Sequence, residues 1–163
     1  MVTAIKGNDT STFGGNIDVT GNVVTDAPAF SAYSTTTTSF SNATYTKVRY
    51  DIEDYDTDSC FDTSNYRFTP TVAGYYQING VMFCSSAASG LSYLTLYKNG
   101  SRVQFGSGIT LVGGPILVLS ALVYLNGSTD YVELFGYQNS GGSLVGGSNQ
   151  ASLKFQGYLV RAV

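Results

Sequence analysis

The stretch of sequence that most constrains the fold is residues 66–83, which read YRFTPTVAGYYQINGVMF. Pro70 cannot donate to a β-ladder and ends a short first strand, and Ala73-Gly74 supplies a turn because glycine tolerates a positive φ. The strand that follows sends alternate side chains to opposite faces. Apolar groups occur on both faces, Tyr76, Ile78 and Met82 on one and Tyr75, Val81 and Phe83 on the other. One face fits a core, and the other needs a cover, for which another copy of the chain is the obvious candidate.

Two later stretches show the same two-faced pattern. Residues 116–125 are almost continuously apolar. Residues 153–160 place Leu153, Phe155 and Leu159 on one face and Tyr158 and Val160 on the other. If the three strands are neighbours in one sheet, that sheet is apolar outside as well as inside, and an exposed patch of that size marks an interface.

Turn signals separate the remaining strands. Asn99-Gly100 lies between two alternating stretches and is the preferred type I′ hairpin, and Asn126-Gly127 offers a second turn. Residues 28–33 and 45–52 are also expected to be strands, and no helix is expected. Strands that recur about every 8 to 12 residues with turns between them predict an all-β sandwich or jelly roll.

Charge and hydropathy exclude two classes of partner. The net charge of −3 and the eight scattered Lys and Arg residues do not suit a nucleic-acid surface. The longest apolar run, residues 116–125, is too short to cross a bilayer. No basic segment precedes an apolar one near residue 1, so we expect no secretory signal peptide.

Residues suited to catalysis are scarce. The chain has no His, so a nucleophilic triad lacks its usual base, and we expect no enzyme. Cys60 and Cys84 lack a C-x-x-C pattern and do not suggest zinc. Free thiols are favoured for a protein assembled in the cytoplasm, with a disulfide as the alternative.

An acidic segment is the one candidate for metal binding. Residues 51–58 hold five of the eleven acidic residues and are expected to form a loop. Asp54, Asp56 and Asp58 could offer oxygen ligands to calcium, but the Asp-x-Asp-x-Asp-Gly pattern is missing. The favoured interpretation is a solvated acidic loop without a cofactor, and paired carboxylates for glycoside hydrolysis are a further alternative.

The first 27 residues differ from the rest. They contain no Tyr and one Phe, and Ile17, Val19 and Val23 alternate with polar residues. Such a segment buries too little apolar surface to fold alone. We expect an extended arm over residues 1–27, ordered by its trimer mates or by another protein, followed by one globular domain over residues 28–163. A floppy tail is the alternative.

Four motifs carry a family resemblance: PAFSA at 28–32, YRFTPTVAGYY at 66–76, LTLYKNG at 94–100 and LKFQGYL at 153–159. In order and spacing they resemble the C1q-like domain, the globular head of the complement C1q and tumour necrosis factor superfamily. The resemblance implies a ten-strand jelly roll that forms a homotrimer, with the first, central and last strands in the inner sheet. Together with the two-faced strands, it predicts a trimer axis lined by Tyr75, Tyr158 and Val160.

The arm carries a second resemblance. GNIDVTGNV at 15–23 is similar to segments common in bacteriophage fibre and virion surface proteins, and C1q-like heads also occur on phage particles. We therefore expect a structural knob on a virion surface, assembled in the host cytoplasm. Ile17, Val19 and Val23 would anchor it to capsid or fibre proteins. The alternatives are a tail-fibre tip that binds a host receptor or surface glycan, and a secreted carbohydrate-binding protein.

Overall fold

The structure is a computed structural model that describes residues 27–85, 90–110 and 114–163. Over these residues the chain is built of antiparallel β-strands without a helix, which confirms the all-β prediction. It follows that no helix in the described residues could span a membrane. The expected arm residues Ile17, Val19 and Val23 lie outside the described residues, so the division into arm and head stays a prediction.

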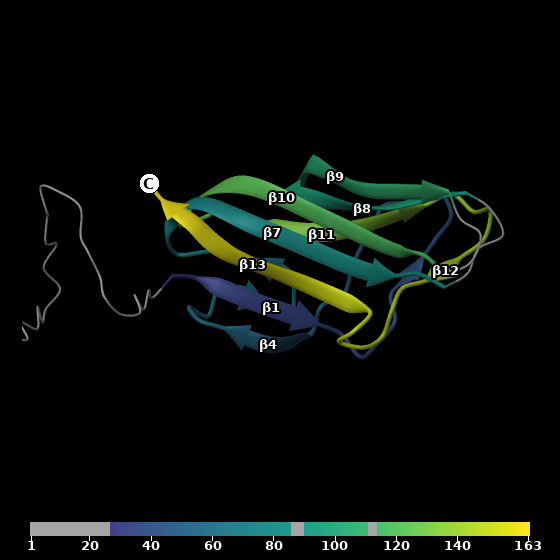
Figure 1. The fold of residues 1–163 in the computed structure, drawn as a ribbon, viewed down its shortest axis with the longest axis horizontal. Helices are drawn as coiled ribbons and strands as arrows, with labels where there is room; N and C mark the ends of the chain where they lie inside the picture. The colour runs from purple at the N-terminus through teal and green to yellow at the C-terminus, as the bar shows by residue number, and fades with distance from the viewer. Residues whose placement is uncertain (1–26, 86–89, 111–113) are drawn as a thin grey trace, which may run out of the picture.

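One sheet contains the three two-faced strands as neighbours. Its order is β10-β7-β13-β1-β4, and Figure 1 shows it as the layer that faces the viewer. The strands are β1 (Ala29–Tyr33), β4 (Ile52–Asp56), β7 (Ala73–Phe83), β10 (Ile116–Asn126) and β13 (Leu153–Ala162). We call it the inner sheet. The prediction that the first, central and last strands share one sheet is confirmed.

The second sheet, called the outer sheet, has the order β5-β6-β11-β8-β9, and β3 also pairs with β11. Its strands are β3 (Thr46–Lys47), β5 (Phe61–Asp62), β6 (Arg67–Phe68), β8 (Leu91–Lys98), β9 (Ser101–Thr110) and β11 (Val132–Gln138). A short pair, β2 (Ser39–Phe40) with β12 (Leu144–Val145), closes one end of the sandwich. Within the described ranges this makes thirteen strands where ten were expected, because five segments are only two residues long.

The core lies between the sheets and is strongly aromatic. Phe30 of β1 stacks on Phe68 at 4.3 Å between ring centroids and meets Phe155 of β13 edge-on at 4.9 Å. All three side chains are fully buried. The space is filled so closely that a Cβ at Gly157 would come within 2.7 Å of Phe30 and Ile78 side-chain atoms.

The hairpin and turn signals are confirmed. Asn99 and Gly100 both have positive φ, 51° and 75°, as a type I′ turn between β8 and β9 requires. Gly127 has a φ of 70°, and the Asn126 side-chain oxygen accepts the N–H groups of Ser128, Thr129 and Asp130. This second turn carries the chain from β10 of the inner sheet to β11 of the outer sheet.

Three local predictions about strands and turns are wrong. Residues 45–52 do not form one strand, because only Thr46–Lys47 pair in a ladder before the chain crosses between sheets. Residues 51–58 are not a loop, since Ile52–Asp56 forms edge strand β4 beside β1. Ala73 and Gly74 do not turn but begin β7, where Gly74 is needed because a Cβ would lie 2.4 Å from the Arg161 carbonyl oxygen.

The free edge of β10 is occupied by side chains of the outer sheet. The Ser107 hydroxyl accepts the Val118 N–H at 3.0 Å and donates to the Val118 carbonyl at 3.1 Å. Lys98 Nζ donates to the Tyr124 carbonyl at 2.8 Å. At the other edge of the inner sheet, β4 exposes Glu53 and Asp54, and charged side chains of this kind protect an edge from pairing.

Candidate functional site

The outward side of the inner sheet is the largest apolar surface that the two-faced strands create. Among the residues of β7, β10 and β13 that point away from the core, eight large apolar side chains stay more than a third exposed. These residues, called the apolar face, are Tyr75, Phe83, Ile116, Val118, Leu122, Tyr124, Tyr158 and Val160. Because single protomers rarely leave so many large apolar groups together in water, this face is the first candidate for an interface.

The three residues predicted to line a trimer axis lie at one end of this face. Tyr75, Tyr158 and Val160 are 43%, 51% and 54% exposed. Tyr158 lies opposite Gln77 in the β13–β7 ladder, and the register shifts between Leu159 and Arg161, so that Val160 lies at an irregularity. The structure brings them together on one surface, while their role at an axis stays a prediction.

Two further residues belong to the same end and were not singled out from the sequence. Tyr124 lies opposite Tyr75 in the β10–β7 ladder, with ring centroids 5.6 Å apart. Leu122 is 61% exposed beside them. The sequence did indicate that residues 116–125 are apolar on both faces. This pattern alone does not show which strand lies next to β7, so Leu122 and Tyr124 could not be placed beside Tyr75.

A polar belt crosses the middle of the apolar face. Gln77 Nε2 donates to Ser120 Oγ at 2.9 Å and to Asn79 Oδ1 at 3.1 Å. Gln156 Nε2 donates to Ser31 Oγ at 3.2 Å. Both amide nitrogens already have acceptors within the protomer, so a partner that covers them does not leave these donors unbonded. The belt separates the tyrosine-rich end from the end that holds Phe83 and Ile116.

The calcium candidates are each engaged by other groups. Asp54 accepts Ser31 Oγ at 2.8 Å and pairs with Lys154. Partial burial is the largest single influence and opposes ionisation, but the hydrogen bonds from Lys154, Ser31 and Gln150 and the charge of Lys154 together outweigh it and lower the pKa of Asp54. Asp56 accepts the Phe61 N–H at 2.6 Å, and Asp58 accepts the Thr71 hydroxyl at 3.4 Å.

Among the described residues, no three His, Cys, Asp or Glu side chains gather as metal ligands would, and the expectation about calcium stays a prediction. Cys60 and Cys84 are both buried free thiols, as favoured from the sequence. Burial raises the pKa of Cys84 to about 11, which keeps the thiol protonated and unreactive at neutral pH.

Aromatic side chains of the outer sheet pack on one another. Tyr93 stacks on Tyr137 at 5.0 Å, and its hydroxyl lies 2.7 Å from that of Tyr45. Arg102 donates to the Tyr45 hydroxyl at 2.6 Å. Tyr97 lies 4.2 Å from Phe135 between ring centroids, so these tyrosines pack within the sheet.

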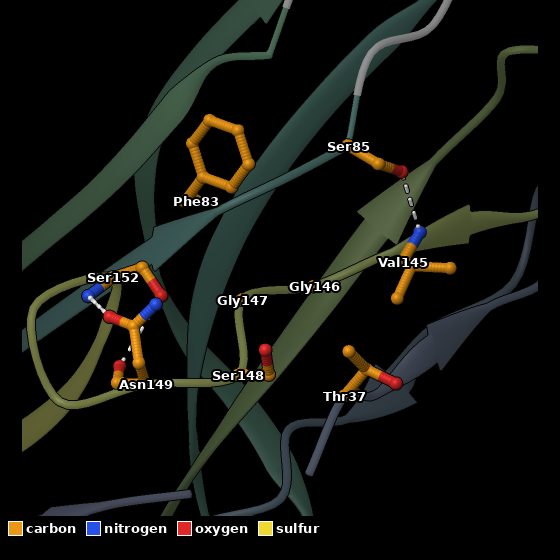
Figure 2. Close-up of a pocket in the computed structure, with 9 residues that line it drawn as sticks. All are labelled: Thr37, Phe83, Ser85, Val145, Gly146, Gly147, Ser148, Asn149 and Ser152. Carbon is orange, nitrogen blue, oxygen red and sulfur yellow. Dashed lines mark hydrogen bonds between the residues drawn. The ribbon is translucent and has the colours of Figure 1, made fainter. Parts of the chain in front are cut away.

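A pocket of about 260 Å³ lies where β7 and β12 end (Figure 2). It was not predicted, because its walls come from three distant parts of the sequence. The lining residues are Thr37, Phe83, Ser85, Val145, Gly146, Gly147, Ser148, Asn149 and Ser152.

Comparison with known proteins shows the fold through structure alone. No protein-family model matches the sequence, and no curated protein matches it. The globular domain of zebrafish complement 1qA protein superposes with a TM-score of 0.61 at 17% identity, over 84% of this chain and 99% of that one. Murine APRIL superposes with a TM-score of 0.61 at 7% identity, over 82% of this chain and 99% of that one.

The Eiger TNF of S. frugiperda is also similar, with a TM-score of 0.57 at 10% identity, over 84% of this chain and 93% of that one. The protein is thus an antiparallel β-sandwich of the jelly-roll class. More narrowly, it has the C1q/TNF-like fold. The resemblance drawn from the four sequence motifs is confirmed at the level of fold.

Proposed function

We propose that this protein is a non-enzymatic, homotrimeric head on the exterior of a bacteriophage particle. The observation that carries the proposal is the apolar face, which three adjacent two-faced strands leave open to solvent. Face-to-face association of three copies covers Tyr75, Tyr158 and Val160 without adding any other chain. The C1q/TNF-like fold supports this arrangement, because the superfamily resemblance implies trimers.

Burial on the expected scale is large enough to hold a trimer together. If each copy buries roughly 1,000 Å² of apolar surface, at about 25 cal/mol per Å² the gross gain is about 25 kcal/mol per copy. The loss of translational and rotational freedom costs about 4–15 kcal/mol per association step. The balance favours a permanent oligomer.

A binding or structural role fits the chemistry better than catalysis. The chain contains no His. The acidic side chains of β4 and its neighbourhood are engaged by Lys154, Ser31 and main-chain groups rather than held as an uncommitted pair. The C1q and TNF structures that share the fold support the same conclusion.

The arm supports the placement on a virion. The main chain of Leu159 donates to the Pro28 carbonyl at 2.9 Å, so the segment before Pro28 joins the head beside the tyrosine-rich end of the apolar face. Three arms would therefore start near one another around the proposed axis. The three arms, each with Ile17, Val19 and Val23, would then bind a capsid or fibre protein together.

Deleting residues 1–24 tests the placement. The truncated protein should remain a soluble, folded trimer and should no longer bind capsids, as measured by co-sedimentation with particles that lack the protein. Immunogold labelling of intact particles should find the full chain on the head. Normal decoration by the truncated protein would show that the arm is not the anchor.

A tail-fibre tip is the second candidate, and the same truncated head distinguishes it. Under that role, the head should adsorb to host cells and block infection. The pocket beside β12 favours this alternative, because Figure 1 shows β12 at the end of the sandwich opposite to the start of β1.

A further inference from the structure

We propose that the polar belt on the apolar face forms hydrogen bonds to the same belt of a second copy of this chain, and so fixes the level at which the copies meet. The inference rests on the proposed trimer and deepens it, because it names the polar groups through which one copy recognises the next. The belt consists of Ser31, Asn79, Ser120 and Gln156, with Gln77 beside them.

The belt is a single row across four neighbouring strands. Ser120 lies opposite Asn79 in the β10–β7 ladder, and Asn79 lies opposite Gln156 in the β7–β13 ladder. Gln156 in turn lies opposite Ser31 of β1. Residues that are directly opposite one another in a ladder point to the same side of the sheet. These four polar side chains therefore share one level on the outward side of the inner sheet.

Exposed apolar side chains flank the belt on both sides. The row one step towards the tyrosine-rich end holds Leu122 and Tyr158, opposite Gln77. The row one step towards Phe83 holds Val118. A partner that covers this face must therefore present an apolar band, a polar band and a second apolar band at matching spacings. Another copy of the chain presents the same three bands.

The belt amides keep unused hydrogen-bonding capacity. Asn79 Oδ1 accepts from Gln77 Nε2, but no described residue accepts from Asn79 Nδ2. Gln77 and Gln156 donate through Nε2, and no described residue donates to the Oε1 atom of either. The buried side-chain atoms without a partner lie elsewhere among the described residues, so the unused belt atoms are open to water in a single copy.

The unused atoms of two copies complement one another. Asn79 Nδ2 is a donor, and Gln77 Oε1 and Gln156 Oε1 are acceptors, so the donor of one copy can meet an acceptor of the next. Rotation about an axis that runs along the strands keeps every residue at its own height and brings the belts to one level. A polar atom that is covered without a partner lowers an association constant about 5- to 150-fold. Packing at another level, with amides against Leu122 or Val118, is therefore disfavoured.

Asn79→Leu gives the decisive test, because two explanations of the apolar face predict changes of opposite sign. Leucine is similar in shape to asparagine and removes the belt donor. If hydrogen bonds between copies hold the belt, the variant weakens the trimer and speeds subunit exchange by about tenfold or more. If apolar contact alone holds the copies, the added apolar area slows exchange. Energy transfer between differently labelled samples of the full chain measures the exchange rate.

Asn79→Asp is the second variant. It keeps an acceptor for Gln77 and replaces the donor with a carboxylate oxygen, so that three charges lie at one level. The association constant should fall by at least about a thousandfold, and sedimentation at micromolar concentration should show monomers. Circular dichroism reports whether the variant folds. If it does not fold, Asn79→Leu decides, because leucine suits a strand at least as well as asparagine.

Gln104 provides the matched controls, because it is an exposed amide on β9 of the outer sheet. Gln104→Leu and Gln104→Glu should exchange and sediment like the unchanged protein. Unchanged or slower exchange of Asn79→Leu would overturn the role of the belt and leave the trimer and its placement on a particle intact. A trimer of Asn79→Asp that no longer binds particles would also overturn it, and would assign the belt to a virion protein. A monomer of the unchanged protein would instead remove the proposed trimer itself, and the inference with it.

Discussion

Replacing Val160 by lysine should separate the proposed trimer into monomers. Val160 is 54% exposed in the protomer, so about half of its side chain remains to be buried. Full burial of an aliphatic side chain contributes about 1.5–3 kcal/mol. The variant therefore loses about 1 kcal/mol of association free energy per copy, or about 3 kcal/mol per trimer. This lowers the association constant on the order of a hundredfold. Three ammonium groups near one axis add several kcal/mol each in desolvation.

Val103→Lys is the matched control. Val103 is 49% exposed on β9 of the outer sheet, away from the apolar face. Sedimentation velocity at micromolar concentration should give a trimer for the unchanged protein and for Val103→Lys, and a monomer for Val160→Lys. A stable monomer of the unchanged protein, or a trimer that survives Val160→Lys but not Val103→Lys, would refute this assembly.

Four other predictions test the packing, the charges and the thiols. Gly157→Ala should lower the free energy of unfolding by about 1–3 kcal/mol, measured by urea denaturation, because its Cβ would meet Phe30 and Ile78 atoms at 2.7 Å. The hydrogen bonds from Lys98 and Asn99 lower the pKa of Asp130, so this residue stabilises the fold above about pH 4 and the contribution disappears as the pH falls through the lowered value. Acid titrations of the unfolding free energy should therefore be flatter for Asp130→Asn. Cys60 and Cys84 should resist alkylation in the folded protein and react after unfolding, as mass spectrometry can show. Calcium or a chelator should leave the melting temperature unchanged, since Asp54 is paired with Lys154, and a rise of several degrees with calcium would reveal a bound ion.

The sequence predicts the parts of this fold that depend on local pattern. Asn99-Gly100 forms its hairpin because two residues with positive φ suffice to specify the turn. The strand around Ile78 and the strand around Phe155 alternate so regularly that a one-residue shift would expose the core. These same patterns, in the order of four motifs, led to the C1q/TNF-like fold.

Features that depend on distant contacts could not be predicted in the same way. Residues 52–56 resemble a solvated acidic loop, and they form β4 because β1 offers an open edge and Lys154, 100 positions further along, neutralises Asp54. Val48 and Tyr50 alternate as in a strand and are buried, but after the Val48 N–H bonds to the Leu134 carbonyl of β11 the segment leaves the outer sheet and crosses to the inner one.

The two candidate sites differ in the same way, because one follows from local pattern and the other from contacts between distant residues. The alternation of apolar residues predicted that the face with Tyr75 and Tyr158 is exposed in one protomer. This prediction was possible because alternation can be recognised within each strand separately. The pocket depends on Thr37, Phe83 and Asn149 meeting from separate segments. Nothing in their local sequence distinguishes them from ordinary surface residues.

The capped edge of β10 limits how copies of this protein can associate. Ser107 takes up both main-chain groups of Val118, and Lys98 takes up the Tyr124 carbonyl. A strand from a neighbouring molecule would have to displace these side chains before it could extend the sheet, so growth into an open-ended β-filament is blocked at this edge. In the proposed trimer, copies would instead meet through the broad side of the sheet, and a rotation axis would close the assembly at three copies. Many copies of such a molecule can therefore lie close together without joining into a β-filament through the edge of β10.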